Sequence, residues 1–141
     1  MKSLPFALGL LLIASPLYAD TQAVTGKVVV KPVLSATTTS SGQPVVLPQK
    51  DAQVIVSTYE IPPGAVLPKH KHPFPRYAYV QAGTIEVTNL NIDKTETFKT
   101  GDFILEAVDQ WHFGANKGKV PVKLLVIDMV EKGQPNTVLQ K

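Results

Sequence analysis

The sequence predicts an all-β fold, either a sandwich or a barrel, in a single domain. Short runs in which apolar and polar residues alternate recur along the chain, and Gly and Pro separate them at fairly regular intervals. No convincing helical period of 3.6 residues accompanies them. With 141 residues, of which 44% are hydrophobic and 18% charged, the chain can bury one core but is too short for two domains.

The first nineteen residues differ from the rest and predict a secretory signal peptide. Lys2 gives a positive start, residues 6–14 (FALGLLLIA) form a short apolar run, and Ala19 is a small residue at the expected cleavage site. An uncleaved membrane anchor is the alternative, but the run is well short of the ~20 residues that span a bilayer. We therefore expect a periplasmic or secreted protein, with residues 20–141 as one mature domain and no stable membrane association after cleavage.

Strands are expected where β-branched and aromatic residues alternate with polar ones. Residues 24–34 (VTGKVVVKPVL) predict one or two short strands, with Pro32 at an edge or a break. Residues 35–44 are small and polar, which favours a plain surface connector over a functional lid. The other expected strands are residues 53–61, 76–80, 85–90, 95–99, 103–106, 112–116 and, as the central core strand, 120–130.

Turns are expected between these strands. Pro62-Pro63-Gly64 reverses the chain because proline fixes φ and glycine adopts positive φ. Gly83, Gly101 and Asn116 are likewise assigned to turn geometry rather than to ligand contact. The tail from Glu131 onward is polar and is expected to be loosely ordered at its end. The remaining connections are residues 81–84, 91–94, 100–102 and 107–111.

The three histidines predict a metal site. His70 and His72 are separated by one residue, so an extended chain presents both imidazoles on the same face, and the prolines that follow keep the chain extended. His112 can close the site from a neighbouring strand. Neutral imidazole is the commonest ligand for transition metals of borderline softness. The alternative is that the three side chains fill the mouth of a barrel without a metal.

The spacing around the histidines resembles the two motifs of the cupin superfamily, G-x5-H-x-H-x3-E-x6-G and G-x5-P-x-G-x2-H-x3-N. Three positions depart from the motifs: Arg76 replaces the metal-binding Glu, Ala107 the Pro and Asp109 the Gly. The resemblance implies a cupin jelly-roll β-barrel, or double-stranded β-helix, with its core motifs in residues 64–116. The positions that carry the family residue are Gly64, His70, His72, Gly83, Gly101, His112 and Asn116.

By the same resemblance, His70, His72 and His112 bind one divalent transition metal. Iron(II) is favoured for an enzyme, and zinc, manganese, nickel and copper are the alternatives. Arg76 cannot replace the missing glutamate, because guanidinium stays protonated and has no lone pair to offer. It either holds an anionic substrate beside the metal, pairs with Glu106, or is a scaffold residue that reaches solvent. Glu106, if it points inward, is itself a candidate fourth ligand.

The other polar and aromatic residues have less specific expectations. Trp111 and Tyr77 are candidates to line an aromatic pocket, although the aromatic residues near the histidines are more typical of a core. The acidic residues expected in turns or on the surface are Glu60, Asp102, Asp109 and Asp128.

Metal chemistry is the only reaction class that the sequence supports. The chain has no phosphate-binding glycine loop, no serine elbow and no cysteine. Its net charge of +3 comes from scattered lysines, so we expect no nucleic-acid partner. We expect an exported metal-binding cupin, dioxygenase-like, acting on a small organic anion. The alternative is a non-catalytic periplasmic cupin that binds a small ligand or a metal. Because cupins commonly pair through edge strands, we also expect a homodimer through residues 24–34.

Overall fold

The computed structural model describes residues 26–141. The expected signal peptide, residues 1–19, and residues 20–25 lie outside this part. Residues 31–141 form one unit, whereas residues 26–30 are the described end of a separate N-terminal unit. The described residues contain no helix, and so none that could cross a membrane.

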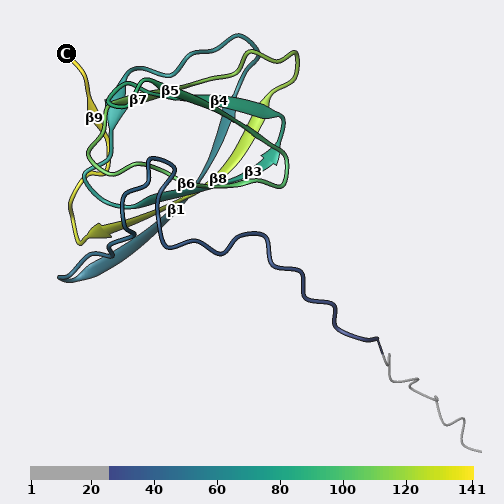
Figure 1. Ribbon diagram of the computed structural model, residues 1–141, viewed down its shortest axis with the longest axis horizontal. Helices are drawn as coiled ribbons and strands as arrows, with labels where there is room; N and C mark the ends of the chain where they lie inside the picture. The colour runs from purple at the N-terminus through teal and green to yellow at the C-terminus, as the bar shows by residue number, and fades with distance from the viewer. Residues whose placement is uncertain (1–25) are drawn as a thin grey trace, which may run out of the picture. The chain divides into compact units, whose positions relative to one another are not determined.

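Two antiparallel sheets form the fold and confirm the expected all-β jelly roll (Figure 1). The first sheet has the order β1-β8-β3-β6, with β1 at Ala52–Ile61, β8 at Val122–Glu131, β3 at Arg76–Ala82 and β6 at Phe103–Leu105. The second sheet has the order β5-β4-β7-β2-β9, with β5 at Lys94–Lys99, β4 at Thr84–Asn89, β7 at His112–Ala115, β2 at His70–Lys71 and β9 at Val138–Leu139.

The core lies between the inner faces of the two sheets. β8 pairs with β1 on one side and with β3 on the other, as expected for the central core strand. Its alternate residues Val122, Leu124 and Val126 are buried because successive side chains of a strand point to opposite faces. From the second sheet, Ile85 packs into the same cluster. Removal of this apolar surface from water is the main stabilising contribution available to a chain without cysteine.

Two turns show why the expected turn residues are needed. Gly83 has a φ of +81°, and a Cβ atom there would lie 2.8 Å from the carbonyl oxygen of Pro121, so only glycine fits. Asn116 is buried and donates hydrogen bonds to the carbonyl oxygens of Ile61 and Val120. It therefore joins the end of β1 to the loop before β8, which confirms its assignment to turn geometry.

Two predictions about the N-terminal part differ from the structure. Residues 26–34 form no strand; strand propensity mainly reflects packing against neighbouring strands, and no described strand pairs with this run. Residues 35–44 are more than a plain connector. Thr38 bridges Pro44, and the Gln43 side chain exchanges two hydrogen bonds with the backbone of Val108, so this turn holds the loop that follows Glu106.

The tail was expected to be loosely ordered at its end, but the structure places strand β9, Val138–Leu139, there. β9 pairs with β2, and Asn136, two residues before β9, is buried. Asn136 is the buried polar residue of this segment, and its side chain bonds to Phe74 and Asp128, whereas most of the other tail residues are exposed.

Candidate metal centre

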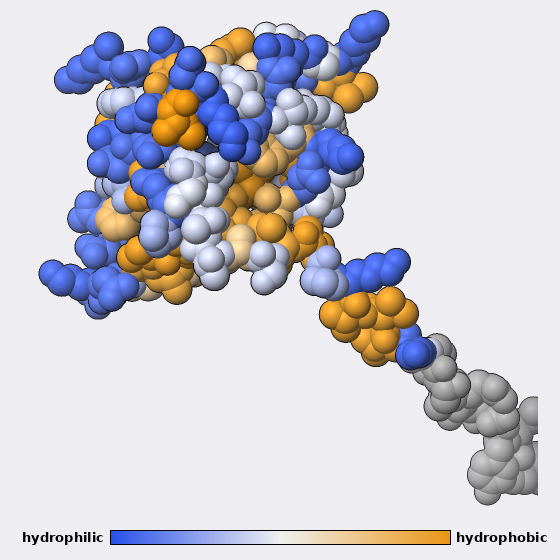
Figure 2. Space-filling view, viewed as in Figure 1, coloured by the Kyte–Doolittle hydropathy of each residue, from blue (hydrophilic) through white to orange (hydrophobic). Residues whose placement is uncertain are grey.

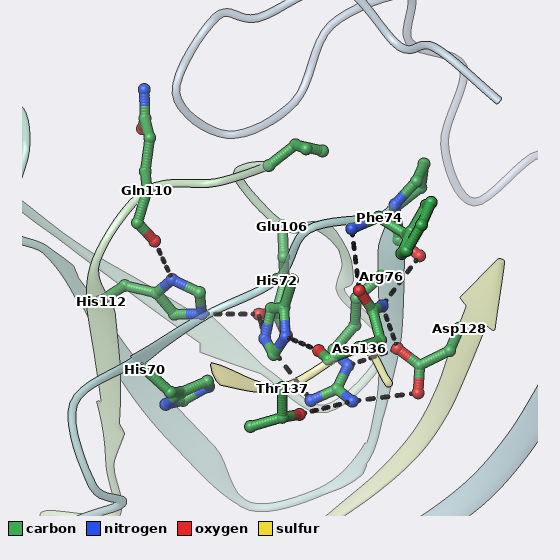
Figure 3. Close-up of polar contacts among 12 residues, drawn as sticks. His70, His72, Phe74, Arg76, Glu106, Gln110, His112, Asp128, Asn136 and Thr137 are labelled. Carbon is green, nitrogen blue, oxygen red and sulfur yellow. Dashed lines mark hydrogen bonds and ion pairs between the residues drawn. The ribbon is translucent and has the colours of Figure 1, made fainter. Parts of the chain in front are cut away.

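The fold brings His70 and His112 to directly opposite positions. β2 is only two residues long and lies between β7 and β9, and His70 pairs with His112 in the register of β2 and β7. His72 follows β2 and forms a bridge with Val108. The three imidazoles point toward one another (Figure 3), with ring centroids 4.5–4.9 Å apart.

Backbone carbonyls fix the orientation of all three imidazoles. The Nδ1 atoms of His70 and His112 lie 2.7 and 2.8 Å from the carbonyl oxygens of Pro68 and Gln110, and Nδ1 of His72 bonds to the carbonyl of Asn136. A carbonyl oxygen only accepts, so each Nδ1 carries the hydrogen and donates it. Each Nε2 is therefore the nitrogen left to act as a ligand, the arrangement found in protein metal sites.

Glu106 completes the group of donors. Glu106 follows β6 of the first sheet. Its Oε2 atom lies 3.0 Å from Nε2 of His112 and 3.1 Å from Nε2 of His72. The four donor atoms, one each from His70, His72, His112 and Glu106, all lie within 4.8 Å of one another. Ligands bound at about 2.0–2.2 Å to one metal ion are spaced by about 3 Å, so this donor set fits a mononuclear centre.

Burial and the carboxylate shift the pKa values of these groups in different directions. Burial is the main cause that lowers the pKa of His70 to about 4. Burial also lowers the pKa of His112, but the hydrogen bond to Glu106 and the charge of that carboxylate outweigh it and raise the pKa overall. For Glu106, burial raises the pKa, and the hydrogen bonds with His112 and His72 bring it well below its ordinary value.

Arg76 pairs with Asp128 and not with Glu106. Its Nε and Nη2 atoms lie 2.7 and 3.0 Å from the two carboxylate oxygens of Asp128, and Nη1 lies 3.4 Å from Nε2 of His72. The two residues are only 7% and 6% exposed, so Arg76 does not reach solvent and Asp128 is not a surface residue. Asp128 was expected on the surface, but alternate residues of β8 point inward. Asp128 shares this inward face with Leu124 and Val126, a pattern that the sequence already contained.

Asn136 is a second residue that the sequence did not point to. Besides accepting the hydrogen bond of His72 through its carbonyl, its side chain accepts one from the backbone N–H of Phe74 at 2.9 Å and donates one to Asp128 at 2.6 Å. Thr137 then accepts a hydrogen bond from Arg76 at 3.3 Å. The C-terminal segment thus supports the candidate ligands, and no motif or period in the sequence indicated this contact.

Residues 57–128, just over half of the chain, match a family described as Cupin domain. The chain belongs to the cupin family. Among curated proteins the sequence has no match.

Solved structures of cupin-type proteins share the fold. The DMSP lyase DddQ from Ruegeria pomeroyi is 20% identical with a TM-score of 0.55, over 64% of this chain and 44% of that one. The polyketide cyclase RemF from Streptomyces resistomycificus is 19% identical with a TM-score of 0.54, over 66% and 65%. An uncharacterised double-stranded β-helix protein from Klebsiella pneumoniae is 23% identical with a TM-score of 0.51, over 82% and 99%. This chain thus spans less than two thirds of the first two proteins.

The cavity beside the histidines of this cupin is small. It measures about 30 Å³, room for water-sized molecules, and Arg76, Glu106 and His112 line its polar side. Neither Trp111 nor Tyr77 lines it. The apolar residues that also line it are Leu67, Ile85, Val87, Ile104, Leu124 and Val126.

Proposed function

We propose that this cupin binds one divalent transition metal ion through Nε2 of His70, His72 and His112 and the carboxylate of Glu106. The observation that carries the proposal is the convergence of these four donors, with every Nδ1 already engaged by a carbonyl. Glu106, which follows β6, supplies the carboxylate that the cupin motif places at the position of Arg76. It offsets one of the two charges of the ion.

The donor set restricts the metal to ions that accept imidazole together with carboxylate. Iron(II) is the choice for an oxygen-dependent enzyme, and zinc, manganese, nickel and copper are the alternatives. When bound, such an ion supplies Lewis acidity and, if it is redox-active, chemistry with oxygen. The protein contributes positioned ligands, apolar side chains around the cavity and a neighbouring cation, Arg76.

We propose as the activity a dioxygenase-like reaction on a small organic anion, carried out by an exported protein. Arg76 supports it only in part, because Asp128 already occupies Nε and Nη2 and leaves Nη1 directed to the site. Contact with an anion would therefore involve one nitrogen rather than a bidentate pair. The small cavity favours the second candidate, a non-catalytic periplasmic cupin that binds a metal or a small ligand.

Metal analysis of the exported protein tests the metal proposal. We expect about one equivalent of a transition metal in the wild type and none in the His70→Ala/His72→Ala variant. Lys71→Ala is the matched control, since this residue lies between the two ligands but pairs with Asp109. A wild-type protein that is metal-free and cannot be loaded would contradict the proposal. Oxygen uptake with small carboxylates and diketones then separates the two candidates: the binding protein consumes none.

A further inference from the structure

Two of the four candidate ligands lie in paired strands and two lie just beyond the ends of strands. His70 and His112 are directly opposite each other in β2 and β7. Glu106 comes directly after β6, and His72 comes directly after β2. A regular ladder of backbone hydrogen bonds therefore does not hold the backbone that carries Glu106 and His72, and other contacts must do so.

The loop from Glu106 to Asp109 lies against the backbone of His72. Val108 forms a parallel bridge with His72, and the backbone N–H of Asp109 donates a hydrogen bond to the carbonyl oxygen of His72 at 2.7 Å. Glu106 lies only two residues before Val108, and its own N–H donates to the carbonyl oxygen of Arg76 at 3.0 Å. The position of Val108 therefore affects the backbone of both ligands.

The side chain of Gln43 holds Val108 from the other direction. Its Nε2 donates a hydrogen bond to the carbonyl oxygen of Val108 at 2.9 Å, and its Oε1 accepts one from the backbone N–H of Val108, also at 2.9 Å. The side-chain amide thus pairs with Val108 as the peptide group of a neighbouring strand would. The hydroxyl of Ser41 donates a further bond to Oε1 at 3.0 Å, which helps to orient the amide.

The turn that carries Gln43 is tied to the same loop at a second point. The backbone N–H of Ser40 donates a hydrogen bond to the carbonyl oxygen of Leu105, the residue before Glu106, at 2.8 Å. Residues 28–30, earlier in the chain, are three valines that are 71–84% exposed, and Figure 2 shows hydrophobic residues on the surface close to the grey part of the chain. Hydrogen bonds on both sides of Glu106 therefore join the turn to the loop, with little apolar packing from these valines.

We propose that Gln43 is a positioning residue of the metal centre, which holds the carboxylate of Glu106 where it can bind the ion. Both polar atoms of its side chain are engaged by Val108, so Gln43 acts through the loop and not as a ligand. A carboxylate that comes from a loop needs this support more than a ligand within a paired strand does. This role rests on the proposed metal binding, and it adds to the site a residue that lies outside the cupin motifs.

Metal affinity is the first test of Gln43. The variant Gln43→Met keeps a side chain of similar length but removes both bonds to Val108. Supporting contacts around ligands contribute about 10–100-fold in metal affinity, and we expect a loss of about tenfold because Gln43 acts through the backbone. Gln49→Met is the matched control, since Gln49 is exposed and its side chain bonds to the carbonyl oxygen of Leu47, two residues away. Competition with a chromophoric chelator measures the affinity, and urea unfolding shows that each variant is folded.

The same substitution in the Glu106→Gln background separates positioning from a general loosening of the fold. If Gln43 acts through the carboxylate of Glu106, Gln43→Met should lower the metal affinity by a smaller factor in Glu106→Gln than in the wild type, because the ligand that it positions is already lost. A merely structural effect would lower the affinity by the same factor in both. Equal factors, or a Gln43→Met variant with wild-type affinity, would overturn the role of Gln43 and leave the proposed metal binding intact.

A readout in the metal-free protein keeps the two proposals apart. The NMR chemical shift of the Glu106 carboxyl carbon reports on its contacts with His72 and His112. We expect Gln43→Met to change this shift and to accelerate the amide hydrogen exchange of Val108, and Gln49→Met to do neither. A wild type that cannot be loaded with metal would refute the proposed metal binding, whereas an unchanged carboxyl shift in Gln43→Met would refute the role of Gln43.

Discussion

At the scale of single residues, Glu106 and His112 form the contact that most affects the chemistry of the site. In the metal-free protein the carboxylate raises the pKa of His112, so this imidazole binds a second proton that it shares with Glu106. His70 has a pKa of about 4 and stays neutral at neutral pH. A metal ion must displace the proton on His112 before it can bind Nε2.

Metal binding should therefore release a proton. At pH 6.5, the ordinary pKa of histidine, a raised pKa keeps His112 more than half protonated, so we expect between about 0.5 and 1 proton released per metal ion from this residue. In Glu106→Gln the largest causes of the increase are gone and burial still lowers the pKa, so His112 should release fewer protons. Titration calorimetry in buffers with different ionisation enthalpies measures this number. Equal release by both proteins would contradict the argument.

Removing one partner of the Arg76–Asp128 pair should lower the free energy of unfolding more than replacing both partners with apolar residues. Asp128→Ala leaves a buried guanidinium without its partner, and we expect a loss of about 3–5 kcal/mol in the free energy of unfolding. The double variant Arg76→Met/Asp128→Leu should recover most of this loss. Urea unfolding measures both, and Lys123→Met, in an exposed pair with Glu60, should change little. A small effect of Asp128→Ala would show that the pair is not buried in solution.

At this scale, the sequence predicted which side chains meet but not all of their partners. The spacing of His70 and His72 was sufficient for these two to share a face of an extended chain, whereas the approach of His112 depends on the pairing of β2 with β7. The partner of Arg76 depended on the register of β3 against β8, a long-range property that local patterns do not contain. Glu106 was predicted either as a fourth ligand or as the partner of Arg76, because a single acidic residue has no spacing to a second ligand that would decide its role.

At the scale of elements, β9 is the strand that the sequence missed and the one that supports the site. It has only two residues, too short for an alternating pattern, and it forms because β2 offers an edge. The long strand β1 was predictable from its alternation, and β8 from its being the most apolar stretch of the mature chain. Short strands depend on neighbours that are distant in sequence.

Loosening the segment before β9 should weaken metal binding. Asn136→Ala removes the side-chain bonds to Phe74 and Asp128 that hold the carbonyl against His72, and such supporting contacts typically contribute 10–100-fold in metal affinity. Competition with a chromophoric chelator measures the affinity. Asn116→Ala is the control, because it also removes buried hydrogen bonds but lies in a turn away from the ligands. If both variants bind metal as wild type does, β9 has no role in the site.

At the scale of the whole molecule, the candidate ligands come from both sheets. His70 and His112 lie on strands of the second sheet, and Glu106 follows β6 of the first. A metal ion held by all of them connects the sheets across the barrel, in a chain that has no disulfide to do so. Ligand binding to the native state alone then adds directly to the free energy of unfolding.

The metal should therefore raise the melting temperature of the entire domain. At a free metal concentration of 100 times the dissociation constant, the expected gain is about 2.7 kcal/mol, or roughly 10 °C for a domain of this size. The gain should shrink as the pH falls from above 6.5, because the raised pKa of His112 lets protons compete with the metal already in that range. Differential scanning calorimetry of the metal-loaded and chelator-treated proteins measures it. The His70→Ala/His72→Ala variant should show no gain; an equal gain there would mean that the ion stabilises the fold from another position.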